Sequence, residues 1–418
     1  MLSLGFSILF VAVLLVTIAL RFWLAARQMR HVSAHRDQVP SQFAARIALR
    51  AHQKAADYTI AKTRFGLLQV VVSSAVLIGF TLLGGLQWLA ANVMPLAGTG
   101  MAYQIALLVA FAAVSGLIDL PFDYARQFGL EAHFGFNKMS RALFFRDRLV
   151  GTLLGAALGL PLVWVILLLM QKSGGLWWVY AWLVWSGFQL LMLWLYPTVI
   201  APLFNKFTPL ADEPLRLRIE GLMRRVGFAS NGLFVMDGSK RSAHGNAYFS
   251  GFGSAKRIVF FDTLLSRLAP AEIEAVLAHE LGHFKLKHIV KRILMMFALS
   301  LGFLALLGFL KSQVWFYTGL GVLPNATVSN DAMALILFAL VLPVFTFVFA
   351  PLTSISSRKH EFEADAFAAK HTGAQDLVSA LVKLYDDNAA TLTPDPLHSA
   401  FYDSHPQATA RINRLLAA

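Results

Sequence analysis

Residues 65–118 read FGLLQVVVSSAVLIGFTLLGGLQWLAANVMPLAGTGMAYQIALLVAFAAVSGLI and contain no Asp, Glu, Lys or Arg. A helix of about 20 apolar residues crosses a bilayer, so this stretch is too long for one crossing. Pro95 and Gly98 favour a turn within it. The stretch therefore predicts two membrane-spanning helices, near residues 66–91 and 101–120.

The composition of the whole chain and its other apolar segments indicate a membrane protein with further crossings. Its composition is 57% hydrophobic and 14% charged, whereas soluble domains are about 45–50% apolar and about 25% charged. The first apolar segment is longer than the core of a cleaved signal peptide, about 7–15 residues, so we expect it to be retained. Five more spans, and thus seven in all, are predicted at Leu4–Trp23, 149–170, 176–199, Ile293–Leu310 and 332–352.

The loops between these spans alternate between rich and poor in Lys and Arg. The rich loops, with nine and five such residues, are 21–64 and 121–148. The poor loops, with one at most, are 92–100, 171–175 and 311–331. Basic loops favour the cytoplasmic side, which predicts an outer N-terminus and a cytoplasmic C-terminus.

The formal net charge of +13 is explained by these basic loops. No basic stripe interleaved with aromatic residues is present, so no nucleic-acid partner is expected. The chain also has no cysteine. A disulfide or thiolate site is therefore excluded, and a metal would have to be held by His, Asp or Glu.

Two polar segments are predicted to form one cytoplasmic α+β domain that a helical hairpin interrupts. Gly232–Asp237 and Arg257–Phe261 are rich in Val, Ile and Phe, which indicates strands. Pro270–His288 is typical of a helix, with Glu272 and Glu274 near its start. The expected order is a five-helix membrane region, a first protease part, the hairpin and a second protease part, at residues 1–199, 200–292, 293–352 and 353–418.

The first protease part contains His279-Glu280-Leu281-Gly282-His283. Residues four apart lie on one face of a helix, so both imidazoles can bind one Zn²⁺. Glu280 can take a proton from the attacking water, which zinc makes more acidic. A solvated helix face is the alternative, but the preceding residues are apolar, and polar groups on a buried helix need partners.

The third ligand must come from elsewhere, and a helical stretch at Ser357–Lys370 offers candidates. Glu361 and Asp365 share one face, so the pair can supply one ligand and one carboxylate that orients a ligating His. We expect an apolar stripe of Phe362, Ala366 and Ala369 beside them. Glu363 lies on another face and is predicted to be a solvated surface charge.

Together these stretches resemble the integral-membrane zinc CAAX prenyl protease family, type I. The resemblance covers nearly the whole chain, including the order of the spans and the split soluble domain. It is carried by Tyr196–Pro209, Gly245–Phe249, Lys256–Leu265, His279–His288, Ser357–Ala369 and Tyr402–Pro406.

The resemblance implies a role for each matching residue and one Zn²⁺ per chain. The implied zinc ligands are His279, His283 and Glu361, with Glu280 as the catalytic base. Asp365 matches an acidic residue that either orients a ligand or donates a proton. The remaining matches are Asn246 as a contact to the substrate backbone, His405 as a donor to the oxyanion and Arg411 as a substrate-binding residue near the site.

The residues alone leave two of these roles open. Asn246 precedes Ala247-Tyr248-Phe249, so it could lie on an edge strand that pairs with an extended peptide, or simply in a turn. His405 could equally be a loop histidine. His288, His360 and His398 are predicted to be surface or structural residues.

The expected function is a membrane zinc metalloendopeptidase that trims C-terminal residues from proteins, with or without a prenyl group, inside a chamber formed by seven helices. A quality-control protease of the HtpX kind is the alternative, although such proteins have fewer spans. A transporter would need charges within its spans, and an inactive scaffold would have lost a site residue. The compact chain after Asn246 and the lack of a C-terminal extension favour a bacterial origin. We therefore expect a protein of the bacterial inner membrane, and we expect it to be a monomer.

Overall fold

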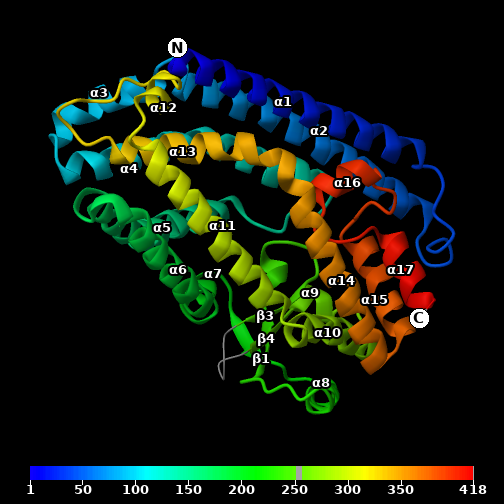
Figure 1. Cartoon of the computed structure of the whole chain (residues 1–418). Coiled ribbons are helices and arrows are strands. Elements are labelled where there is room, and N and C mark those ends of the chain that lie inside the picture. Colours follow the sequence, from blue (N-terminus) through cyan, green and yellow to red (C-terminus); the bar gives the residue numbers. More distant parts are fainter. Residues whose placement is uncertain (251–256, 418) are drawn as a thin grey trace.

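The computed structural model describes residues 1–250 and 257–417 and consists mainly of long helices joined to a smaller α+β part (Figure 1). Seven helical segments in this described part are long and apolar enough to cross a membrane, as the sequence predicts. They are Leu2–Ala34, Leu49–Phe80, Met101–Glu131, Arg141–Lys172, Gly174–Phe204, His288–Leu310 and Asp331–Thr372.

Several of these segments combine more than one helical element. The first two are α1 and α2, the fourth is α5 and the sixth is α11. The third joins α4 (Met101–Tyr124) to a π-helical turn, and the fifth joins a 3-10 turn (Gly174–Leu176), α6 (Trp177–Leu195), a second π-helical turn and α7 (Ala201–Phe204). The seventh runs through α13 (Asp331–Thr346), a 3-10 turn and α14 (Ala350–Thr372).

The second span differs from the sequence prediction of residues 66–91. Helix α2 begins at Leu49 and ends at Phe80, and a separate helix α3 (Gly85–Ala97) follows. The break lies at Gly84, which has a left-handed φ of 77°, a conformation that glycine adopts without strain. The predicted turn near Gly98 is also present, with φ of 74°. The helices of this apolar stretch are thus interrupted twice, where hydropathy alone indicates one turn.

The N-terminal end of α1, helix α3 and the loop at residues 311–331 gather at one end of the molecule (Figure 1). This loop contains α12 (Val314–Thr318). Three hydrogen bonds join segments here, namely Ser3 to Thr318 at 2.7 Å, Leu323 N–H to Gln87 at 3.0 Å and Lys311 to the Met170 carbonyl at 3.0 Å. The loops that are poor in Lys and Arg therefore lie on a common side.

The α+β part lies toward the other end of the long helices (Figure 1). Its described strands form one sheet in the order β1-β2-β4-β3, in which β2 and β4 run parallel and the outer pairs run antiparallel. The strands are β1 (Phe207–Pro209), β2 (Leu233–Met236), β3 (Ala247–Ser250) and β4 (Arg257–Phe261). Both strands predicted from the sequence, now β2 and β4, are therefore confirmed.

Helices from both polar segments share a hydrophobic core with this sheet. Helix α10 packs along α14 and also contacts α15 and α8. Apolar side chains of β4, α8 and α10 meet at Phe260, Ile219 and Leu281, all fully buried. These helices are α8 (Glu213–Arg225), α9 (Asp262–Leu265), α10 (Pro270–Lys285), α15 (Ala374–Asp387), α16 (Pro396–Tyr402) and α17 (Ala408–Leu416).

The membrane-spanning helices do not pack into a solid bundle. Only 6–11% of the residues in the most apolar stretch of each of the first six are buried, against 44% in the seventh. A cavity of about 750 Å³ lies among α1, α2 and α13, and Arg21, Lys62, His398 and Tyr402 also line it. This cavity is mainly apolar, has cationic groups in its lining and adjoins α16. Helix α16 is close in sequence to His405.

Candidate metal centre

Hydrogen bonds and ion pairs near the start of helix α10 fix its position. The Glu272 carboxylate accepts a hydrogen bond from the Ala269 N–H at 2.7 Å and also binds Ser379 and Lys383 of α15. Glu274 is buried and pairs with Arg218 and Arg225 of α8. Of the two glutamates expected near the helix start, Glu272 caps the first turn, and Glu274 ties α10 to α8.

Helix α14 approaches α10 closely at Gly282. A Cβ atom at Gly282 would lie 3.0 Å from the Ala364 Cα and 3.1 Å from the Phe367 Cβ, so a side chain here would force the helices apart. The prediction of an apolar stripe through Ala366 is wrong, because Ala366 is exposed. Ala364 and Ala368 are buried instead, since small side chains are needed where the two helices touch.

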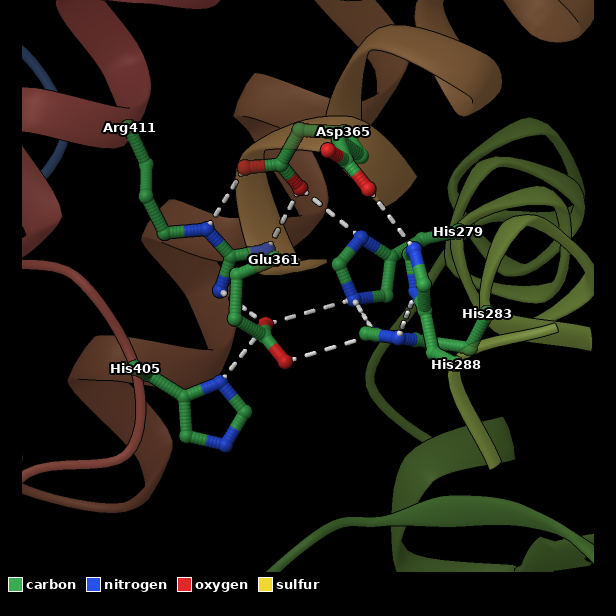
Figure 2. A network of polar contacts seen from close by, with 8 residues as sticks. His279, His283, His288, Glu361, Asp365, His405 and Arg411 are labelled. Carbon is green, nitrogen blue, oxygen red and sulfur yellow. Dashed lines mark hydrogen bonds and ion pairs between the residues drawn. The ribbon is translucent and has the colours of Figure 1, made fainter. Parts of the chain in front are cut away.

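This crossing brings His279, His283 and Glu361 together (Figure 2). The two Nε2 atoms are 3.2 Å apart. The Glu361 carboxylate oxygens lie 3.5 Å from the His279 Nε2 and 3.3 Å from the His283 Nε2. Ligand atoms at about 2.0–2.1 Å from a tetrahedral zinc would be about 3.3–3.4 Å apart. The three side chains therefore fit three corners of a zinc site.

A buried ion pair supports this triangle on the α14 side. The Asp365 Oδ1 is 2.8 Å from the His279 Nδ1. Arg411 of α17 binds both Asp365 oxygens, at 2.8 and 2.6 Å, and its guanidinium is 3.8 Å from Glu361. Asp365 can thus orient His279, and Arg411 holds Asp365 in place.

The electrostatics of the group favour a cation. Glu361 and Asp365 are buried carboxylates, and Arg411 is the buried cation that contacts them. Burial raises the pKa of the nearby Glu280. Burial also opposes a charge on His279, yet hydrogen bonds to Asp365 and Glu361 outweigh it and raise its pKa to about 9. A divalent ion would offset this excess of negative charge.

A cavity of about 290 Å³ adjoins the triangle. Its lining includes Glu280, Asn246, His405 and Arg411, so the structure places all the remaining candidate residues except Asp365 at this cavity. The His405 side chain is 60% exposed, and its Nδ1 is 2.7 Å from a Glu361 oxygen. Arg411, expected to contact substrate, reaches the cavity while its guanidinium is bound to Asp365.

Asn246 immediately precedes β3, which pairs with β4 and lies at an edge of the sheet. Its carbonyl accepts a hydrogen bond from the Phe261 N–H at 3.0 Å, and its side chain accepts one from the Ala247 N–H at 2.8 Å. The sequence left Asn246 either at an edge strand or in a turn. The structure places it beside the edge strand.

Two residues near the metal site make a contact that the sequence did not predict. Glu363, expected to be a solvated charge, lies with one oxygen 2.9 Å from the His288 Nε2. His288, left as a surface or structural residue, is 1% exposed and touches His283. The helix pattern could not reveal this contact, because α10 ends at Lys285 and Lys287 has a left-handed φ of 58°.

Two family models match the chain. Residues 28–206 match the CAAX prenyl protease N-terminal family with five membrane helices, and residues 209–418 match peptidase family M48. The chain belongs to the CAAX prenyl protease family of M48 peptidases. It is accordingly a metalloprotease and a multi-pass membrane protein.

Relatives of this M48 protein match along most of its length. The CAAX prenyl protease 1 homolog of Arabidopsis thaliana is 36% identical, with 90% of each chain covered. The Homo sapiens homolog is 30% identical, with 97% of this chain and 95% of that one covered. The crystal structure of S. mikatae Ste24p matches with a TM-score of 0.92, 31% identity and coverage of 98% of this chain and 99% of that one. These relatives are eukaryotic, so they give no support to the expected bacterial origin.

Proposed function

We propose that this M48 protein is a zinc endopeptidase that removes C-terminal residues from prenylated proteins. One Zn²⁺ per chain would be held by His279, His283 and Glu361. The observation that carries the proposal is the spacing of their ligand atoms, 3.2–3.5 Å, beside a cavity that Glu280 lines. All these residues come from one chain, which supports an active monomer.

Zinc bound here would polarise the scissile carbonyl and make water acidic enough to lose a proton near neutral pH. Glu280 would take that proton as general base and pass it to the leaving amine. The His405 imidazole would donate a hydrogen bond to the oxyanion, where negative charge develops. Asn246 would hold the substrate backbone along β3, and Asp365, held by Arg411, would orient His279.

The prenylated substrate class is supported by the relatives, which are named CAAX prenyl proteases. A quality-control protease of the HtpX kind is not favoured, because the family match and the seven spans both agree with the CAAX proteases. The apolar cavity among α1, α2 and α13 lies within the part of the chain that lipid would surround. A lipidated substrate could therefore approach the site from the membrane.

A digestion experiment tests this function. The full-length protein in detergent should cleave a peptide ending in a farnesylated Cys plus three residues, and release those three residues. The same peptide without the farnesyl group should be cleaved more slowly, because binding energy from the lipid is lost. Equal kcat/KM for both peptides would contradict the requirement for prenylation, and cleavage of neither would contradict the proposed function.

The orientation proposed for the chain has its N-terminus outside and its C-terminus in the cytoplasm. The basic loops support it, as does the gathering of the weakly basic loops at one end. We also propose the division into residues 1–199, 200–292, 293–352 and 353–418, with both protease parts cytoplasmic.

Single cysteines introduced into this Cys-free chain test the orientation. Asn413→Cys and Ala326→Cys replace exposed residues of α17 and the 311–331 loop. In sealed cells, an impermeant thiol reagent should label position 326 and should reach position 413 only after permeabilisation. Labelling of position 413 alone in intact cells would reverse the proposed orientation.

His405 and Asn246 should differ in steady-state kinetics. His405→Ala should lower kcat about 10²–10³-fold with little change in KM, because its hydrogen bond gains strength in the transition state. Asn246→Ala should raise KM at least as much as it lowers kcat, because the substrate backbone is held in both states. Both variants should keep zinc. Loss of zinc from His405→Ala would make His405 a ligand, and unchanged kinetics would make it an ordinary loop histidine.

A further inference from the structure

The ligand imidazole of His283 has a second nitrogen that faces away from the metal triangle. Its Nε2 is 3.3 Å from Glu361 Oε1, whereas its Nδ1 is 3.0 Å from the Nδ1 of His288. The His288 Nε2 in turn lies 2.9 Å from Glu363 Oε2. Figure 2 shows His288 beside His283 on the side away from His405.

The chemistry of the three groups fixes the direction of these hydrogen bonds. A ligating Nε2 must present its lone pair to the metal, so the proton of neutral His283 lies on Nδ1 and is donated. His288 accepts it at Nδ1, which leaves its own proton on Nε2. That proton is donated to the Glu363 carboxylate, and each polar atom in the series has a partner of the right kind.

The packing around His288 leaves it little freedom to turn. The residue is 1% exposed, and its ring stacks on His360 with centroids 4.1 Å apart and planes 14° apart. The chain enters α11 at His288 through Lys287, whose left-handed backbone turns it back toward α10. Glu363 comes from α14, only two residues after the ligand Glu361.

We propose that His288 and Glu363 are positioning residues that fix the ring orientation and proton location of His283 for zinc binding. This inference rests on the zinc site of the proposed function. It gives each ligand histidine its own support, since His279 is held at Nδ1 by Asp365. Partners of this kind typically contribute 10–100-fold to metal affinity.

A second metal site at His288, His360 and Glu363 is the competing interpretation, since their ligand atoms lie within 4.8 Å of one another. Ring nitrogens bind metals in the plane of the ring. Two rings stacked face to face cannot direct both lone pairs at one ion, and both His288 nitrogens already face partners. The contacts therefore favour support of His283.

Two matched substitutions on the stacked rings test the proposal. In the full-length protein in detergent, zinc Kd is measured by competition with a chelator for wild type, His288→Phe and His360→Phe. Both changes keep an aromatic ring, but only the first removes the acceptor for His283. His288→Phe should weaken zinc binding about 10–100-fold, whereas His360→Phe should stay close to wild type.

Glu363 provides an independent arm of the same experiment. Glu363→Gln keeps an oxygen that can accept from His288 and should retain zinc affinity, whereas Glu363→Ala should weaken it. The melting temperature of the chelator-treated protein should be unchanged in all four variants, which separates positioning from general loss of structure.

Four outcomes would overturn the proposal. These are wild-type zinc affinity in His288→Phe, equal losses in His288→Phe and His360→Phe, a lower melting temperature that accounts for the loss, and two zinc ions per wild-type chain. Failure of the proposed function would look different, because the wild-type protein itself would then bind no zinc or would cleave neither peptide.

Discussion

Glu280→Gln should keep zinc bound and lose peptide cleavage. The amide is nearly the same size as the carboxylate but cannot accept a proton from water, so only the general base is removed. General bases contribute about 10²–10⁴-fold to rate, and kcat should fall at least by that range. Glu280 is not one of the three proposed ligands, although it lines the same cavity. Zinc content per chain should therefore equal that of wild type.

The measurement combines metal analysis of the purified protein with kinetics on a farnesylated peptide. Glu213→Gln is a matched control, because it makes the same chemical change at an exposed position on α8, and it should cleave like wild type. A Glu280→Gln enzyme with kcat within a few-fold of wild type would remove Glu280 from the role of base. A variant without zinc would instead place Glu280 among the ligands.

Replacing His279, His283 or Glu361 with Ala should remove both zinc and activity. A catalytic zinc site uses three protein ligands, so losing one leaves two and an enlarged open position. Glu361→Ala should have a further effect, because His405 and Arg411 both lie close to its carboxylate. Without the Glu361 carboxylate, the buried guanidinium of Arg411 would lose one of its carboxylate partners.

Metal content and cleavage of the same peptide test these three variants. His371→Ala, near the end of α14, is the matched control and should retain both. If Glu361→Ala kept full zinc and activity, the third ligand would have to be another residue. His405 would then be the first candidate, since its Nδ1 lies 2.7 Å from the Glu361 carboxylate.

Hydropathy predicted the seven spans because the hydrocarbon core of a bilayer accepts only a long apolar helix. Such a segment must be apolar whatever its neighbours are. The same reasoning failed between α2 and α3, where apolar residues continue across the break at Gly84. A turn between two apolar helices leaves no change in hydropathy, and its location depends on backbone conformation.

The sequence by itself determined how His279, Glu280 and His283 lie relative to one another, because five consecutive residues on one helix fix their positions. It also brought Glu361 and Asp365 onto one face of a second helix. Only the tertiary structure decided how those helices meet. Their crossing depends on the close contact of Gly282 with Ala364, which local periodicity does not encode.

The contacts that support His279 and His283, the two proposed ligand histidines, were likewise decided by the tertiary structure. Arg411 reaches Asp365 from α17, and Glu363 reaches His288 across 75 residues of sequence. A histidine and a glutamate that far apart look like ordinary surface residues when each is taken with its neighbours in the chain. Their contact exists because the left-handed turn at Lys287 directs His288 back toward α10, where Glu363 of α14 also reaches it. Burial there requires each polar atom to find a partner.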